Sequence, residues 1–171
     1  MTRQPEEEDI RMNVPVNPRD LRTAFGKFAT GITVITVRSG DQDHGMTANS
    51  FTSVSIDPPM LLVCVSKKAR SLGVISECRQ FGVSVLAEDQ QSVSNHFAGK
   101  PEFDKVVFAS LGGVPTIKGA IAQFGCRLDA IYDAGDHAIL VGEISAYSYC
   151  DGRPLLYQDG GYRELSSDPL E

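Results

Sequence analysis

The sequence has no excess of positive charge and no long hydrophobic run. Its 171 residues include 16 Lys and Arg against 22 Asp and Glu, which gives a formal net charge of -6. Because proteins bind nucleic acids largely through Lys and Arg contacts to phosphates, this balance argues against a nucleic-acid surface as the main function. No apolar run reaches the roughly 18 residues that a membrane-spanning helix needs, so we expect no membrane insertion.

Cysteine and histidine are scarce and scattered. The four cysteines show no C-x-x-C spacing, and the three histidines are not paired at metal-ligand spacing, so we expect no metal site. The first residues, MTRQPEEEDIRMNVPVNP, lack the apolar segment of a secretory signal. Separated cysteines in such a chain are typical of reduced thiols, and we expect a cytoplasmic protein.

The common catalytic motifs are missing too. The sequence contains no G-x-S-x-G, no H-E-x-x-H, no P-loop and no G-x-G-x-x-G after a strand. A bound nucleotide would therefore not be held by a Rossmann fingerprint. The members of a hydrolytic triad need not be close in sequence, but the three histidines and the missing nucleophile elbow disfavour one.

The remaining composition is that of an ordinary globular protein, with 42% hydrophobic and 22% charged residues. The length fits one domain with a substantial core. We expect this domain to span residues 17–165. A flexible acidic arm, residues 1–16, precedes it, and a short tail, residues 166–171, follows it.

The hydrophobic pattern predicts a mainly β fold with a few short helices. Asn17 and Pro18 are typical of a helix start, and the apolar residues that follow at helical spacing predict a face packed on the core, up to a break at Gly31. Solid β-branched runs then predict strands at 32–37, 60–65, 81–87 and 137–147. Short helices are expected at 69–78 and 90–98. Tight turns, including 39–45, favour antiparallel pairing and a small barrel.

The segment HGMTANSFTSVSIDPP (44–59) reads as one strand crowded with small polar side chains. Small residues such as Thr47, Ala48 and Ser50 would let a flat ligand approach the backbone. Asn49 could present a donor and an acceptor to the edge of a heterocycle. The other interpretation, an edge strand with a wet polar face, stays open for this segment alone.

Two further clusters carry chemistry. The stretch SKKARS (66–71) combines three cations and two hydroxyls with a predicted helix start, a combination suited to a phosphate. An ordinary basic loop is the alternative.

His137 stands in AGDHA (134–138), directly after a tight turn. Asp136 could orient its imidazole there. A purely structural histidine is the alternative.

Seven motifs in order resemble the short-chain flavin reductase family, the reductase components of two-component flavin-dependent monooxygenases. They are FGKFATGITVIT (25–36), GMTANSFTSVSIDPPMLLVCV (45–65), FGVSVLAEDQ (81–90), FAG (97–99), SLGGVPTIKGAIAQF (110–124), AGDHAILVGEI (134–144) and PLLYQDGGYREL (154–165). The resemblance implies an antiparallel Greek-key split β-barrel in a homodimer. It also implies hydride transfer from NADH, or from NADPH, to FMN or FAD. Reduced flavin would then pass to a separate oxygenase.

The resemblance also implies site residues. The ring of the flavin would be bordered by Thr47, Ala48, Asn49, Ser50, Phe51, Ser53 and Val54, with Phe97 nearby. The phosphate side would be held by Lys68, Ala69, Arg70 and Ser71. His137, Gly161, Tyr162 and Arg163 would contact the nicotinamide cofactor, with His137 as a positioning group rather than an obligate base. Two alternatives remain: a flavin carrier without reductase activity, and a reductase that passes electrons from flavin to a corrinoid or ferric iron.

Overall fold

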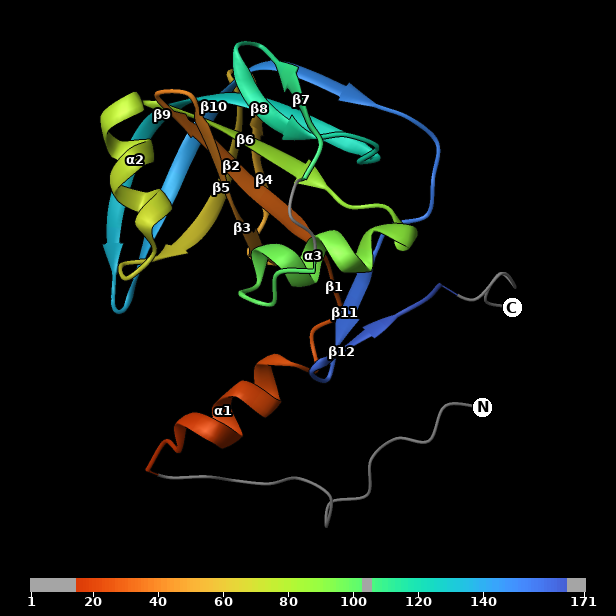
Figure 1. The fold of residues 1–171 in the computed structure, drawn as a ribbon. Helices are drawn as coiled ribbons and strands as arrows, with labels where there is room; N and C mark the ends of the chain where they lie inside the picture. The colour runs from red at the N-terminus through yellow and green to blue at the C-terminus, as the bar shows by residue number, and fades with distance from the viewer. Residues whose placement is uncertain (1–14, 103–105, 166–171) are drawn as a thin grey trace.

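The fold is described from a computed structural model, which describes residues 15–102 and 106–165 (Figure 1). Most of the predicted acidic arm and all of the predicted tail lie outside these residues. The helices are α1 (Pro18–Phe25), α2 (Arg70–Cys78) and α3 (Gln91–Phe97), with a 3-10 turn at Glu88–Gln90 before α3. The strands are β1 (Thr30–Gly31), β2 (Thr33–Ser39), β3 (Gln42–Ala48), β4 (Thr52–Ile56), β5 (Pro59–Ser66), β6 (Gln80–Val85), β7 (Phe108–Leu111), β8 (Val114–Ile117), β9 (Ala122–Ala134), β10 (His137–Tyr149), β11 (Leu156–Gln158) and β12 (Gly161–Arg163).

One antiparallel sheet dominates the architecture, with the strand order β3-β2-β6-β9-β10-β5-β4. β1, β11 and β12 form a small second sheet, and β7 pairs with β8. In Figure 1 α2 covers one side of the large sheet, and α3 lies near the end of β3. The predicted mainly β split barrel with a few short helices is confirmed. No helix in the described ranges is both long and apolar enough to cross a membrane.

The two edges of the large sheet are drawn together by a side chain. Ser50 lies in the break between β3 and β4, and its hydroxyl donates to the carbonyl of Cys64 at 3.1 Å and accepts from the N–H of Cys64 at 2.9 Å. Because β4 and β5 pair with Thr52 opposite Leu62, Ser50 falls opposite Cys64 in the same register. The hydroxyl thus takes the place of a ladder bond where the backbone turns away.

The core divides into two clusters on the two faces of β2. Ile35 and Val37 face the first cluster, while Val34 faces the second, so β2 is buried on both faces as its solid apolar run predicts. In the first cluster burial raises the pKa of the Cys126 thiol to about 12, which keeps it protonated and unreactive.

The predicted first helix is confirmed at its start but not at its end. The Asn17 side chain accepts from the N–H of Arg19 at 2.9 Å, as expected of a cap, but the helix ends at Phe25, before the expected break at Gly31. The expectation that one face packs on the core is wrong for the described chain: α1 buries no residue, and Phe25 and Phe28 are 69% and 78% exposed. In Figure 1 α1 lies beside the β11–β12 hairpin, away from the large sheet.

Strand boundaries differ from the prediction around the polar segment. Residues 44–59 do not form one strand, because the backbone leaves β3 after Ala48 and re-enters the sheet as β4 at Thr52. The expected turn at 39–45 is shorter, since β2 and β3 run to Ser39 and from Gln42 around Gly40, whose φ of +59° favours glycine. The predicted helices at 69–78 and 90–98 match α2 and α3 closely.

Gly82 marks a close approach of β6 to β8, and its replacement offers a test of this packing. A Cβ at Gly82 would lie 2.2 Å from the Pro115 carbonyl oxygen and 2.5 Å from the Thr36 hydroxyl, which are bonded to each other in the core. We expect Gly82→Ala to lower the free energy of unfolding by about 2–3 kcal/mol in urea denaturation.

Gly73→Ala is the matched control, because nothing lies within 4 Å of a Cβ at Gly73 in α2. We expect it to leave stability unchanged or raise it by up to about 1 kcal/mol, since alanine favours the helix. Equal stability of the two variants would contradict the close approach.

Candidate functional site

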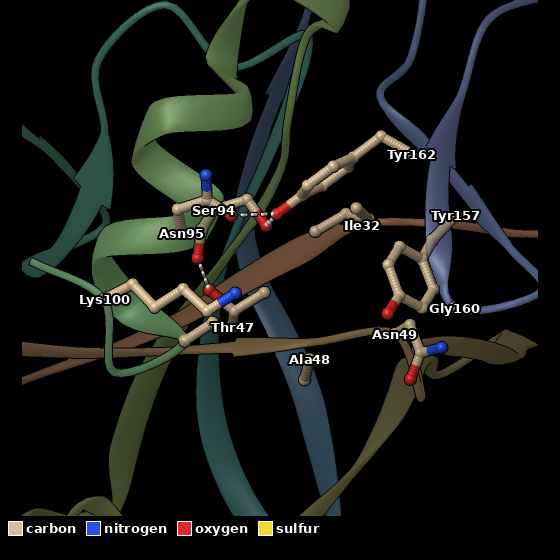
Figure 2. A pocket seen from close by; sticks show the side chains of 11 residues that line it. Ile32, Thr47, Ala48, Asn49, Ser94, Asn95, Lys100, Tyr157, Gly160 and Tyr162 are labelled. Atoms are coloured by element: carbon tan, nitrogen blue, oxygen red, sulfur yellow. Dashed lines mark hydrogen bonds between the residues drawn. The ribbon is translucent and has the colours of Figure 1, made fainter. Parts of the chain in front are cut away.

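The principal cleft lies where the end of β3, helix α3 and the β11–β12 hairpin meet (Figure 2). Its volume is about 320 Å³. Its lining is formed by Ile32, Thr47, Ala48, Asn49, Ser94, Asn95, Ala98, Lys100, Tyr157, Gly160 and Tyr162. These residues include no histidine, cysteine or carboxylate.

The β3 side of the cleft is rigid because its polar groups are bonded to neighbouring elements. The Thr47 hydroxyl donates to the carbonyl of Ser94 in α3 at 2.7 Å, and the Ala48 carbonyl accepts from the Thr33 hydroxyl at 2.8 Å. The Asn49 side chain is exposed and lies at the cleft in Figure 2, where no hydrogen bond ties it to the described part of the chain. It is therefore available to a ligand as both donor and acceptor.

The opposite side of the cleft is aromatic and is tied to α3. The Tyr162 hydroxyl donates to Asn95 Oδ1 at 2.6 Å and lies 3.1 Å from Ser94 Oγ. Asn95 Nδ2 donates in turn to Glu102 Oε1 at 2.7 Å, which fixes the amide orientation. Tyr157 packs edge-to-face on Tyr162, with 5.6 Å between ring centroids. The hairpin and the helix thus hold a preformed aromatic wall.

A second polar cluster surrounds the start of α2. Ala69 at the N-cap makes no side-chain capping bond, and the first turn has no acidic residue, so backbone N–H groups and the positive end of the helix stay available. Lys68 and Arg70 are exposed there, whereas Lys67 is engaged with Asp133 at 2.7 Å. This cluster is suited to a phosphate.

His137 lies beside this second cluster. It opens β10 opposite Ser66, and its Nδ1 lies 2.7 Å from Asp136 Oδ1. The hydrogen bond to His137, together with the charge of that imidazole and, to a smaller extent, of Lys68, holds the pKa of Asp136 below its ordinary value. Asp136 therefore stays ionised and orients the imidazole, as the sequence had allowed.

Comparison with known proteins decides the family. The model of the flavin reductase like domain matches residues 25–166. The chain belongs to this family. It is 45% identical over 154 residues to an NADH-dependent flavin reductase of a Rhodococcus species, covering 88% of each chain. It is 42% identical over 145 residues to the reductase component of 4-hydroxyphenylacetate 3-monooxygenase of Thermus thermophilus, covering 84% of this chain and 94% of the other.

A solved structure agrees with this assignment. The NADH:FAD oxidoreductase of Streptomyces globisporus C-1027, solved with NAD and FAD fragments, superposes with a TM-score of 0.81 at 40% identity and covers 90% of this chain and 97% of the other. The resemblance to flavin reductases that the sequence motifs carry is thereby confirmed.

The structure of this flavin reductase family member brings some predicted site residues together. Thr47, Ala48, Asn49 and Tyr162 line the cleft. Gly161 and Arg163 flank Tyr162 on β12, and the Arg163 guanidinium is turned onto the Tyr162 carbonyl at 3.0 Å. Phe97 lies just outside the lining, with its ring over Gly45 of β3.

Other predicted residues lie elsewhere. Lys68, Ala69 and Arg70 form the second cluster together with His137, so one chain does not bring His137 to Tyr162. The predicted ring contacts on β4 and before it, and Ser71 of the predicted phosphate side, have other surroundings. Ser53 and Val54 are exposed on β4, Phe51 stacks on Phe124, and Ser71 donates to Met46 Sδ at 3.1 Å.

The hydroxyls of Thr47 and Ser50 are both bonded within the protein, to the Ser94 carbonyl and to the backbone of Cys64. Sequence reasoning missed Ser94, Asn95, Lys100 and Tyr157 as cleft residues. The QSVSNHF run of α3 reads as an ordinary short helix, and only the tertiary contact with β12 shows its role.

The residues present fit a flavin nucleotide. Asn49 offers the donor and acceptor that a heterocycle edge needs, and the uncapped start of α2 beside Lys68 and Arg70 suits its phosphate. The two regions meet at the end of β3, where Met46 contacts Ser71 next to Thr47. No cluster of three or more metal-ligating side chains occurs in residues 15–102 and 106–165.

The tie between Tyr162 and Asn95 can be measured by removing one hydroxyl. We expect Tyr162→Phe to lower the free energy of unfolding by about 1–2 kcal/mol, because the Asn95 oxygen loses its donor. Tyr157→Phe, whose hydroxyl has no hydrogen bond to the described residues, should change stability by less than about 0.5 kcal/mol. A double-mutant cycle of Tyr162→Phe with Asn95→Ala should show coupling of at least about 0.5 kcal/mol, and additive effects would disprove the tie.

The pairing of Asp136 with His137 predicts a pH effect. A lowered folded-state pKa means that the pair stabilises the fold above the ordinary aspartate pKa, and that this contribution is lost as pH falls through the lower value. His137→Ala should therefore raise the Asp136 pKa toward its ordinary value in an NMR titration of the carboxyl carbon. Lys68→Met should raise it less. An unchanged pKa in His137→Ala would argue that the contact is absent in solution.

Proposed function

We propose that this chain is an NADH-dependent flavin reductase that transfers a hydride to FMN or FAD and releases reduced flavin to a separate monooxygenase component. The observation that carries the proposal is the cleft itself: the Asn49 amide, which has no hydrogen bond to the described residues, faces a tyrosine wall, and the described lining contains no histidine, cysteine or carboxylate. Hydride transfer between two cofactors needs ring alignment rather than proton-transfer groups, so such a lining suits it.

The relatives support this reaction and these cofactors. The Rhodococcus relative is named for NADH-dependent flavin reduction, and the Thermus relative for its place as a reductase component. The predicted activity and the predicted flavin and nicotinamide cofactors agree with the name of the Rhodococcus relative. Transfer of reduced flavin to a separate oxygenase, and a cytoplasmic location, remain parts of the proposal.

Each predicted group then has a task. When both cofactors are bound, the nicotinamide supplies the hydride and the flavin accepts it. The backbone of residues 47–50 and the Asn49 amide would orient the polar edge of the flavin ring, with Phe51, Ser53, Val54 and Phe97 at its periphery. The α2 start with Lys68, Ala69, Arg70 and Ser71 would hold the phosphate side. Gly161, Tyr162 and Arg163 would border the nicotinamide, and His137 would position it.

A homodimer is also part of the proposal. α1 buries no residue, and Phe25 at its end and Phe28 just after it are exposed, so these apolar side chains lack a covering surface in the described chain. A second copy would supply one. It would also allow His137, which one chain holds apart from Tyr162, to act at the cleft of the other copy.

Mixing the purified protein with NADH and free FMN or FAD tests the reaction. We expect loss of NADH absorbance that requires flavin and protein, at rates well above the mixture without protein. Flavin binding without NADH oxidation would identify a flavin carrier instead. With His137→Ala we expect the KM for NADH to rise more than the flavin Kd. The reverse pattern would remove His137 from the nicotinamide side.

A further inference from the structure

Among the described residues that line the cleft, Lys100 is the one that carries a charge. In Figure 2 its side chain points into the cleft on the α3 side, across from Tyr157. None of the other lining residues is a carboxylate or a cation. Lys100 therefore gives the lining formed by residues 15–102 and 106–165 a single positive charge.

The turn at the end of α3 fixes the position of Lys100. Gly99 follows the helix with a φ of +84°, a left-handed conformation that favours glycine, and the N–H of Lys100 donates to the Asn95 carbonyl at 3.0 Å. This closing turn folds the chain back over the cleft. Asn95 thus holds Lys100 through its backbone while its side chain holds Tyr162.

The ammonium group of Lys100 has no partner within the described ranges, whereas several other cations there are neutralised. Lys27 pairs with Asp159 at 2.8 Å, and Lys67 pairs with Asp133 at 2.7 Å, both on the outer surface. No carboxylate lies within 4.0 Å of Lys100 among residues 15–102 and 106–165. A cation left unpaired at a ligand cleft attracts an anionic group of the ligand.

The proposed reaction requires two phosphate-bearing ligands, and the cations at the start of α2 and at the end of α3 occupy two separate positions. Lys68 and Arg70 at the start of α2 form one position, and no residue of the segment 66–71 lines the cleft. Lys100 at the end of α3 forms the other position, on the same anchor as the tyrosine wall. The α2 position is assigned to the flavin, which leaves Lys100 for the second nucleotide.

We propose that Lys100 binds a phosphate of the nicotinamide dinucleotide and so raises the affinity for this substrate. The assignment rests on the proposed function. Because the side chain is exposed, its contribution is modest and depends on salt, unlike that of a buried ion pair.

Calorimetric titration of NAD⁺ into the protein with saturating FMN tests the assignment. We expect Lys100→Met to raise the NAD⁺ Kd about three- to tenfold at low salt and to flatten its salt dependence, because one phosphate contact is lost. Lys100→Arg should restore most of the affinity. Lys118→Met is the matched control, since Lys118 is an exposed lysine outside the cleft lining, and its Kd should equal that of the wild type.

Flavin titrations identify the source of the phosphate. We expect the Kd values of FMN and riboflavin, followed by flavin fluorescence, to be unchanged in Lys100→Met. A weaker FMN Kd with unchanged riboflavin and NAD⁺ values would assign Lys100 to the flavin phosphate and overturn the proposal. Equal losses for riboflavin, FMN and NAD⁺ would show a structural effect and overturn it as well.

The two proposals can fail separately. If the wild-type protein oxidises no NADH with FMN or FAD, the reductase function is wrong. If it does, and the NAD⁺ Kd of Lys100→Met equals that of the wild type, only the assignment of Lys100 is wrong.

Discussion

The cleft depends on the Ser50 hydroxyl, which serves both backbone groups of Cys64 where the chain passes from β3 to β4. Without it, a partly buried N–H and C=O of β5 would lose their partners. With it, residues 49–51 can leave the ladder while the two edges of the large sheet stay joined. The end of β3 is thereby held in place, with its backbone open to a ligand. A bulkier side chain at Ser50 would separate the edges.

Much of the fold could be predicted from the sequence, because its signals were local. The Asn17 cap, the solid apolar run of β2 and the start of α2 after SKKA each depend on neighbouring residues alone. β9 was not predicted, because its burial alternates irregularly and register shifts interrupt its pairing with β10. The apolar spacing of α1 predicted a helix correctly. It could not tell whether the covering surface belongs to the same chain.

The candidate site was predictable only in part, because some of its residues are defined by contacts between segments that are distant in sequence. Residue type and motif order singled out Asn49 and Tyr162, both of which line the cleft. Ser94 and Asn95 carry no such mark, since a short polar helix looks the same whether or not a tyrosine distant in sequence binds to it. The hydroxyls of Thr47 and Ser50 show the converse case. Their chemistry also suits a ligand, but in the structure both are bonded to backbone groups of the protein.

Asn95 supports two parts of the cleft, the tyrosine wall and the turn that carries Lys100. Its side chain sets the tyrosine wall, and its carbonyl closes the turn that presents Lys100. Tyr162 and Lys100 therefore share one support in Asn95. A change in α3 would disturb the tyrosine wall and the position of the Lys100 charge together, whereas replacing the Lys100 side chain alone leaves the helix and the wall in place.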